Sequence, residues 1–317
     1  MRYRRSRSVP PRKMLVMPRV SVVVVNFRTP RLTKAAVSTS LDAGAAEVVV
    51  VDNASIDNIA RVLPEDSRVR FLTTDRNRGF GTAANLGASH ATGEVLVFLN
   101  SDAELTGSAL EGLLAELERW EGRAIIGPRV VAPDGAVQRS AGLLPHPTDL
   151  ILRALGLHRI GRWLASAPGI GSIVRRSKMA GEYDSSLSAT SAVETSMISG
   201  ACFAIGRAAF TELDGFDERF FMYFEDADLC RRAHAAGMPV RYLPEAVVRH
   251  VGGASSEGDY RFSPMHARSM RQYMEKWWGP RGAALALLLL WVRMIGHAIT
   301  FRPGTRRAYD ALRAAFG

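Results

Sequence analysis

Two adjacent carboxylates, Glu225 and Asp226, directly follow an aromatic run. The stretch reads Phe220-Phe221-Met222-Tyr223-Phe224-Glu225-Asp226-Ala227-Asp228 and then becomes helical in pattern. A carboxylate beside aromatic rings can be partly desolvated, which raises its pKa and lets it accept a proton from a substrate hydroxyl. The simpler interpretation is an acidic first turn of an amphipathic helix, where free N–H groups and the helix dipole favour carboxylates. The sequence around this pair allows both interpretations.

Polar residues also end three apolar runs, at 20–26, 47–53 and 95–102. These runs do not alternate with polar residues, which is typical of strands buried on both faces. A shorter strand is expected at 69–72 and helices at 30–41, 55–63, 81–91 and 107–120, so the pattern predicts a parallel α/β sheet. Such sheets bind ligands at the carboxyl ends of their strands. The side chains expected at that edge are Asn26, Asp52, Asn53, Asn100 and Asp102.

A glycine-rich turn at 76–81 precedes one of these helices. Such a turn can present backbone N–H groups to a phosphate. The turn has neither the GxGxxG spacing of dinucleotide folds nor the GK(S/T) ending of a P-loop, so alone it is weak evidence for a phosphate site. Farther along, we expect a strand, turn and return strand at 125–138, ordered structure at 196–205, a helix at 207–213 and two short strands at 239–243 and 246–250. His250 ends the last of these, where a lone histidine is more often structural than a metal ligand.

The composition of the 317 residues, 47% hydrophobic and 23% charged, fits one large soluble domain with appendages or two small domains. The net charge of +10 is concentrated at the two ends of the chain. Basic ends suggest an anionic partner surface or solvated tails. Specific nucleic-acid binding is not expected, because the arginines are not interleaved with aromatic residues. Cys202 and Cys230 lack CxxC spacing, which argues against a disulfide framework or zinc site and fits a reducing compartment.

The segment 274–300 predicts a helix with mixed character. Trp277 and Trp278 precede an apolar run at 283–292, which Arg293 interrupts before the roughly 20 residues that a spanning helix needs. Tryptophans beside arginines are typical of a membrane interface, so we expect this helix to lie in one. The alternative is a helix packed on the core of the domain itself.

With these motifs in view, the chain resembles the family 2 glycosyltransferases of the GT-A fold, most closely the bacterial rhamnosyltransferase-like branch. Members of that branch act on polyprenyl-diphosphate-linked sugars in cell-wall assembly. The resemblance runs from about residue 20 to 253. It is carried, in the order of the family, by VVVVNFRTP, VVDNAS, NRGFGTAAN, FLNSD, ISGACFAIGRAAF, GFDERFFMYFEDADLCRR and RHVGG.

The resemblance implies a role for each motif. Asn26, Asp52 and Asn53 would lie around the nucleotide base and ribose, and Asn77, Gly79, Phe80 and Asn85 resemble the donor-pocket loop. Asn100-Ser101-Asp102 stands where the family usually has Asp-X-Asp, so Asp102 would hold a divalent cation, Mg²⁺ or Mn²⁺, on the donor diphosphate. One anionic ligand is missing here because Asn100 replaces the first Asp; His250 resembles a further ligand. Asp226, with Glu225 beside it, matches the catalytic carboxylate that deprotonates the acceptor, and inversion of configuration would follow.

The resulting expectation is an α/β GT-A domain over 20–260, Rossmann-like, with a mostly parallel sheet flanked by helices. Residues 1–19 would form a disordered basic tail, 142–195 an irregular acceptor-side insertion, and 261–317 a basic helical extension that associates with a membrane. The expected reaction transfers a sugar, L-rhamnose from dTDP-rhamnose, to a lipid-linked or polysaccharide acceptor at the inner face of the cytoplasmic membrane. The alternatives are a UDP-galactofuranose or UDP-GlcNAc donor, or a non-catalytic membrane-anchored sensor or scaffold for sugar nucleotides.

Overall fold

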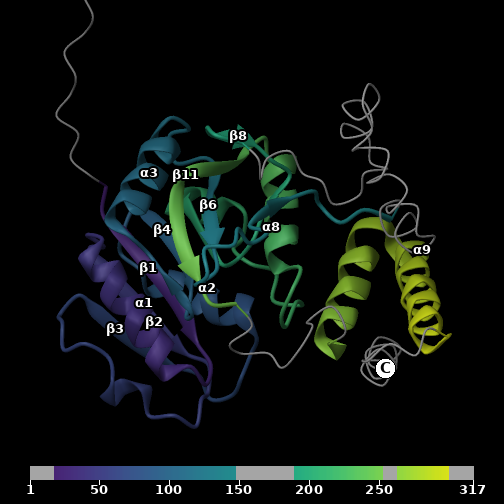
Figure 1. Cartoon of the computed structure of the whole chain (residues 1–317), viewed down its shortest axis with the longest axis horizontal. Helices are drawn as coiled ribbons and strands as arrows, with labels where there is room; N and C mark the ends of the chain where they lie inside the picture. The colour runs from purple at the N-terminus through teal and green to yellow at the C-terminus, as the bar shows by residue number, and fades with distance from the viewer. Residues whose placement is uncertain (1–17, 148–188, 253–262, 300–317) are drawn as a thin grey trace, which may run out of the picture.

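A mixed nine-stranded sheet forms the centre of the computed structural model, which describes residues 18–147, 189–252 and 263–299 (Figure 1). The strand order is β3-β2-β1-β4-β10-β6-β11-β5, and β8 pairs with β11 outside this path. The strands are β1 (Val20–Asn26), β2 (Glu47–Asp52), β3 (Val69–Thr73), β4 (Val95–Asn100), β5 (Ala103–Glu104), β6 (Ile125–Val131), β8 (Val193–Glu194), β10 (Cys202–Gly206) and β11 (Val240–His250). β7 (Ala141–Gly142) and β9 (Met197–Ile198) form a separate two-stranded pair. The tail at 1–17, most of the insertion (148–188) and residues 300–317 lie outside the described residues.

The first half of the sheet is parallel, as predicted. β3, β2, β1 and β4 pair in parallel, then β10 runs antiparallel between β4 and β6, and β6 pairs in parallel with β11. The register places Asn26 opposite Asp52 and Val25 opposite Asn100. The polar ends of the three apolar runs therefore meet at one edge of the sheet.

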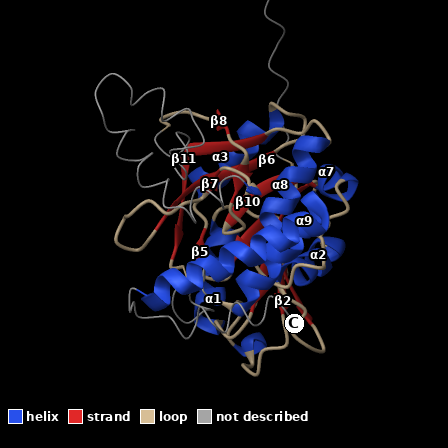
Figure 2. Cartoon of the chain, turned by 90° about the vertical axis from the view of Figure 1, so that its right-hand side faces the viewer, coloured by secondary structure: helices blue, strands red, loops and turns tan. Residues whose placement is uncertain are grey.

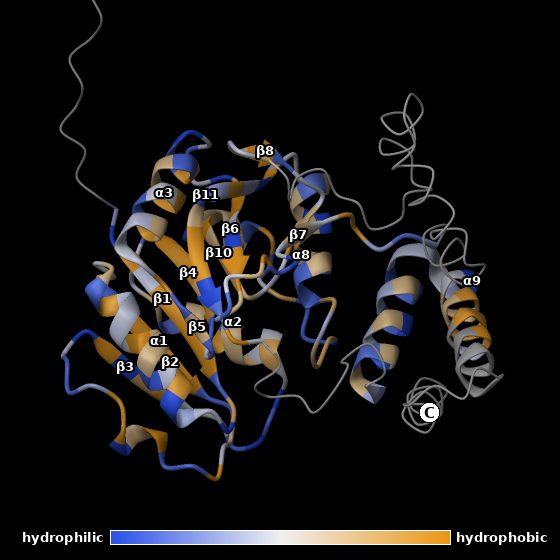
Figure 3. Ribbon diagram, in the orientation of Figure 1, coloured by the Kyte–Doolittle hydropathy of each residue, from blue (hydrophilic) through white to orange (hydrophobic). Residues whose placement is uncertain are grey.

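Helices cover both faces of the sheet (Figures 1 and 2). α1 (Pro30–Asp42) and α3 (Gly107–Glu118) pack on one face, against Val22, Val24 and their neighbours. α2 (Phe80–His90), α7 (Arg207–Glu212) and α8 (Glu225–Ala235) pack on the other, against Val23 and Phe98. Burial on both faces explains why these strands are continuously apolar, as the hydropathy colouring of Figure 3 shows.

Three local predictions were wrong in detail. The helix expected at 55–63 is only a 3₁₀ turn, Ile59–Arg61, in which Ile59 alone is buried, so too little apolar surface holds a longer helix. The return strand at 136–138 reduces to one bridge between Val131 and Val137. The two strands expected at 239–250 are one strand, β11, with a register shift between Leu243 and Val247. Pro244 lies within that shift and has no N–H to donate, so it disturbs the pairing without ending the strand.

The C-terminal helix α9 (Pro264–Ile299) begins ten residues before the expected start and breaks at Gly279. We call residues 264–278 the first arm and 280–299 the second arm. Side chains of the first arm, among them Met270, Tyr273 and Met274, bury Phe220 and Ala227 of the domain. The first arm therefore packs on the domain's own core, which was the alternative interpretation. No helix among the described residues has the length and apolar character needed to cross a bilayer.

Candidate active site

The loop that leads into α8 has a strained backbone. Tyr223 and Phe224 both have left-handed φ angles, 70° and 71°. This conformation costs on the order of 1–3 kcal/mol for each residue that is not glycine, and it persists only where surrounding contacts hold it. Such strain is typical of functional sites. It directs the first turn of α8, with Glu225 and Asp226, out of this loop.

Two backbone N–H groups bind the Asp226 carboxylate. Gly200 N–H donates to Oδ2 at 2.9 Å and Ala227 N–H donates to Oδ1 at 2.7 Å. Burial raises the pKa of Asp226, and these two donors offset part of that rise. The side chain is therefore held in one orientation and made more basic than an exposed aspartate.

Glu225 accepts a hydrogen bond from its own backbone N–H, but its Oε2 atom has no hydrogen-bond partner within the described part of the chain. The residue is 7% exposed. Burial and the neighbouring Asp226 charge raise the pKa of Glu225 to about 8. The two adjacent carboxyl groups therefore titrate as a pair, and burial raises the pKa of both above the ordinary range.

At the ends of β1 and β2, Asn26 is fully buried and uses its whole side chain on protein groups. Its Nδ2 donates to Asp52 Oδ1 at 2.8 Å, and its Oδ1 accepts from the hydroxyl of Thr33 at 2.7 Å. Asp52 is 5% exposed. In this arrangement Asn26 orients Asp52. Of the two side chains, Asp52 is the one that can still accept hydrogen bonds from a ligand, through its carboxylate oxygens.

Asn53 shapes the glycine-rich turn in the same way. Its Nδ2 donates to Asn77 Oδ1 at 2.9 Å and to the carbonyl of Gly79 at 3.1 Å, and its Oδ1 accepts from Arg78 N–H at 3.0 Å. Asn77 Oδ1 also accepts from Gly79 N–H. These amides fix the turn from within, before any ligand contributes.

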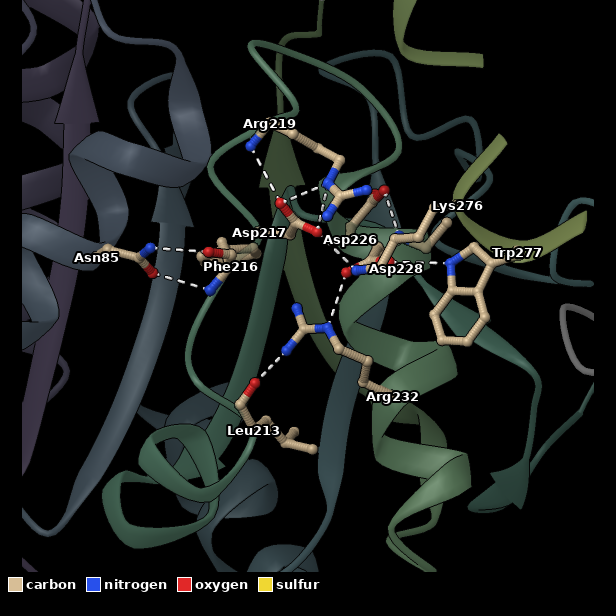
Figure 4. A network of polar contacts seen from close by, with 11 residues as sticks. Asn85, Leu213, Phe216, Asp217, Arg219, Asp226, Asp228, Arg232, Lys276 and Trp277 are labelled. Atoms are coloured by element: carbon tan, nitrogen blue, oxygen red, sulfur yellow. Dashed lines mark hydrogen bonds and ion pairs between the residues drawn. The ribbon is translucent and has the colours of Figure 1, made fainter. Parts of the chain in front are cut away.

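The turn is joined to the loop before α8. Phe80 N–H donates to the carbonyl of Phe221 at 2.9 Å. Gly79 has φ +85°, and a Cβ at this position would lie 2.1 Å from that carbonyl oxygen, so only glycine fits. One helical turn later, Asn85 donates to the carbonyl of Phe216 and accepts from its N–H, each at 2.9 Å (Figure 4). Phe80 and Asn85 therefore join the turn at 76–81 and its helix to the segment 216–221 that precedes α8.

The Asn-Ser-Asp segment meets His250 across 150 positions of sequence. His250 Nε2 lies 3.1 Å from Asp102 Oδ1 and 3.2 Å from Asn100 Nδ2. Burial tends to raise the pKa of Asp102, but the contact with His250 and the N–H of Gly252 hold it below its usual value. Ser101 turns the other way, with its hydroxyl 2.9 Å from that of Thr29, and thereby fixes the end of β4 to the start of α1.

Asp102 and His250 fit a divalent cation. Gln138 Oε1 lies 2.7 Å from His250 Nδ1, so a neutral His250 with its proton on Nδ1 would donate to Gln138 and offer the Nε2 lone pair to a cation beside Asp102. Two acceptors about 3 Å apart match one edge of an octahedron with metal–ligand distances of about 2.1 Å. Within residues 18–147, 189–252 and 263–299, no cluster of three or more His, Cys, Asp or Glu side chains forms a metal site. The remaining ligands would come from the diphosphate and water.

Comparison with models of known protein families gives a match over half of the chain. Residues 21–180 match the family described as Glycosyl transferase family 2. The chain belongs to glycosyltransferase family 2.

Two relatives illustrate this membership. N-acetylglucosaminyl-diphospho-decaprenol L-rhamnosyltransferase of Mycobacterium tuberculosis is 30% identical over 216 residues, which cover 64% of this family 2 chain and 66% of the relative, just under two thirds of its length. O-antigen biosynthesis protein RfbC of Myxococcus xanthus is 28% identical over 84% of this chain and 20% of the relative.

Solved structures with the same fold include two complexes that hold a nucleotide ligand and Mn²⁺. A mannosyltransferase from Pyrobaculum calidifontis in complex with GDP-Man and Mn²⁺ superposes with a TM-score of 0.54 at 16% identity, covering 94% of this chain and 85% of that one. GalNAc-T7 with UDP, GalNAc and Mn²⁺ also gives 0.54, at 17% identity, covering 74% and 44%. These likenesses confirm the GT-A architecture of this family 2 chain.

Several contacts of the site could not be predicted from the sequence. Gln138 and Gly200 contact His250 and Asp226 from positions 112 and 26 residues away. The first arm of α9 contributes Ser269, whose hydroxyl donates to the carbonyl of Met222 at 2.8 Å. A periodicity or a motif cannot show these contacts, because each depends on the pairing of distant segments.

Proposed function

We propose that this chain transfers L-rhamnose from dTDP-L-rhamnose to a lipid-linked or polysaccharide acceptor in the assembly of a bacterial cell-envelope glycan. The observation that carries the reaction type is the Asp226 carboxylate beside the turn at 76–81, which is half-buried, has a raised pKa and is oriented by two N–H donors. The names of the relatives from Mycobacterium and Myxococcus support the sugar and the acceptor class.

The chemistry proposed for the pair is proton removal at the acceptor. Asp226 takes the proton of an acceptor hydroxyl, whose oxygen forms a bond to the anomeric carbon as the bond from that carbon to the diphosphate oxygen breaks. Attack from the face opposite the nucleotide inverts the configuration. Burial and the neighbouring Asp226 charge raise the pKa of Glu225, which disfavours a second negative charge beside the attacking oxygen.

On the donor side, Asp52 together with the turn at 76–81 would receive the nucleotide, and Asn26, Asn53, Asn77 and Asn85 hold these groups in place. Asp102 and His250, with Asn100 adjacent, would hold Mg²⁺ or Mn²⁺. Such a cation neutralises the charge that builds on the leaving diphosphate.

The second arm of α9 supports a membrane surface as partner. Leu288, Trp291 and Val292 are exposed, at 56%, 48% and 38%. An amphipathic helix with a basic flank binds anionic lipid through both its apolar face and its charge. We place the enzyme at the inner face of the cytoplasmic membrane, where a lipid-linked acceptor is reached. Segment 142–195 is proposed to contact the acceptor.

The decisive experiment measures donor binding by calorimetry with dTDP, UDP and GDP, each with and without Mg²⁺ or Mn²⁺, followed by transfer from dTDP-L-rhamnose. Cation-dependent binding of dTDP and transfer of rhamnose are expected. Preference for UDP would keep the enzyme class and replace the sugar, with UDP-galactofuranose and UDP-GlcNAc the donors to test next. Binding of none of the three nucleotides would favour a non-catalytic scaffold.

The membrane proposal is tested by sedimentation with phosphatidylglycerol vesicles at low salt. The intact chain should pellet with the vesicles, and the double variant Leu288→Gln, Trp291→Gln should remain in the supernatant. If the intact chain fails to pellet, the proposed membrane surface is wrong. Equal pelleting of both proteins would place the lipid contact elsewhere.

A further inference from the structure

The first arm of α9 contacts the whole segment that leads into the Glu225–Asp226 pair. Phe220 packs against Tyr273 with ring centroids 6.5 Å apart, and Phe224 packs against the same ring at 5.4 Å. His266 lies against the rings of Tyr223 and Phe224, at 5.6 and 5.1 Å. The strained stretch is therefore enclosed by a helix that follows it by about forty residues in the sequence.

Two polar links fix this packing. Ser269, 2% exposed, donates its hydroxyl hydrogen to the Met222 carbonyl, one residue before the two left-handed residues. Lys276 Nζ lies 2.6 Å from Asp217 Oδ2 and 2.7 Å from Asp228 Oδ1, so one ammonium group joins the start of the loop to α8 (Figure 4). The indole N–H of Trp277 also donates to Asp228 Oδ1 at 2.9 Å.

These contacts explain how the strain persists. Two left-handed residues in sequence favour relaxation of the loop, and burial of Phe220 together with the two polar links opposes it. Asp228 lies two residues beyond Asp226 on the same helix and is itself fully buried. A displacement of the first arm would therefore move the first turn of α8 and its carboxylates.

We propose that Ser269 and Lys276 are positioning residues: through Met222, Asp217 and Asp228 they hold the strained loop in the geometry that presents Asp226 to the acceptor. The first arm of α9 is thus part of the active-site architecture, not only of a membrane-associating extension. This inference rests on the proposed glycosyl transfer for its kinetic test, and its structural test is independent of activity.

The first test is Ser269→Ala, with Ser89→Ala as the matched control. Ser89 also donates from a helix to a backbone carbonyl, at 2.8 Å to Leu86, but it belongs to α2 and bonds within that helix. For Ser269→Ala we expect kcat with dTDP-L-rhamnose and a polyprenyl-diphosphate acceptor to fall roughly 10- to 100-fold, with little change in the donor KM. Ser89→Ala should match the wild type.

Hydrogen–deuterium exchange supplies the readout that needs no activity. Backbone amides of residues 220–228 should exchange faster in Ser269→Ala than in the wild type or Ser89→Ala, while those of β1 and β4 stay protected. If exchange in the loop is unchanged, the positioning role is wrong. If the wild type transfers no sugar but the loop exchanges faster in the variant, the proposed function is wrong, while the role of Ser269 in holding the loop is confirmed.

The pH profile separates positioning from simple loss of stability. The ionisable groups around this turn are Glu225, Asp228 and the Cys230 thiol on α8, Lys276 of the first arm on Asp228, and the packed pair Tyr223 and His266. A relaxed loop admits water, which lowers the raised pKa of Asp226, so the acid limb of kcat should move to lower pH by about half a unit or more. An unshifted limb in a folded but slower variant would contradict the proposal.

The second test is Lys276→Met against Lys276→Arg. Arginine keeps the positive charge between the two carboxylates, whereas methionine keeps only the apolar stem. We expect Lys276→Met to lose kcat and loop protection together and Lys276→Arg to recover most of both. Glu275→Gln, an exposed charge change on the same helix, serves as the control. Equal losses in the Met and Arg variants would remove Lys276 from the proposal.

Discussion

At the carboxyl ends of β1 and β2, the side-chain amides of Asn26 and Asn53 use every donor and acceptor group on protein partners. At the start of α8 the opposite holds: Glu225 Oε2 has no partner in the described residues, and two left-handed residues precede it. At the edge of β1 and β2, which we propose as the donor edge, these amides are thus fully hydrogen-bonded before a ligand binds, and the loop before α8 is held in a state of higher energy by its surroundings.

The difference follows from what each side must do. A nucleotide is bound well by groups that are already oriented, because no ordering cost falls on binding. A base must have a raised pKa, and burial without full hydrogen bonding raises it. Substitutions in either region should therefore have different consequences for catalysis, binding and stability, and the largest is expected at Asp226.

The largest effect is expected for Asp226→Asn, which keeps the shape and removes the base. The rate of transfer should fall about 10²- to 10⁴-fold, the range of general-base catalysis. Nucleotide binding, measured by calorimetry, should stay close to the wild type because the donor edge is untouched. Transfer at the wild-type rate would show that another group removes the proton.

Gly79→Ala should damage the junction of the two regions. An added Cβ would meet the carbonyl oxygen of Phe221 at 2.1 Å, whereas Gly135, with nearly the same φ of +84°, has open space around it. Left-handed strain alone costs about 1–2 kcal/mol, so Gly135→Ala should lose that much and Gly79→Ala clearly more, measured by urea unfolding. Equal losses would mean that the loop moves aside at no cost.

Gln138→Leu tests the cation site through a residue that does not touch the cation. Without its partner on Nδ1, His250 is no longer held in one tautomer and one ring orientation. Loss of such a contact behind a metal ligand typically lowers metal affinity or activity about 10- to 100-fold. The readout is the Mn²⁺ dependence of dTDP binding. An unchanged dependence would show that His250 does not hold the metal.

The smallest effect concerns stability as pH changes. The folded-state pKa of Glu225, about 8, lies above its ordinary value of 4.5, so between these values the folded protein binds more protons than the unfolded one. Stability therefore falls as pH rises through this window. Glu225→Gln removes that loss, and its free energy of unfolding relative to the wild type should increase between pH 5 and 8, by a few kcal/mol at most. A constant difference across that window would mean that Glu225 titrates normally.

Much of the fold could be predicted because the signal is local. The apolar runs of β1, β2 and β4 are continuous since both faces are covered, and their polar last residues meet at one edge since parallel strands end together. The helical pattern after the aromatic run likewise placed Glu225 and Asp226 at the first turn of a helix. The local pattern was misleading in two places. At 55–63 it predicted a helix, but only Ile59 is buried and only a 3₁₀ turn forms. At Pro244 it predicted a break between two strands, but the strand continues through a register shift.

The sequence by itself determined the sheet, its polar edge and the chemical types available there, because burial and helix or strand periodicity act over a few residues. Tertiary structure alone decided how these side chains are used. It made Asn26 and Asn53 orienting groups, brought His250 and Gln138 to Asp102, and closed the first arm of α9 over the loop before α8. Each of these outcomes depends on contacts between distant segments, whose energies no local pattern contains.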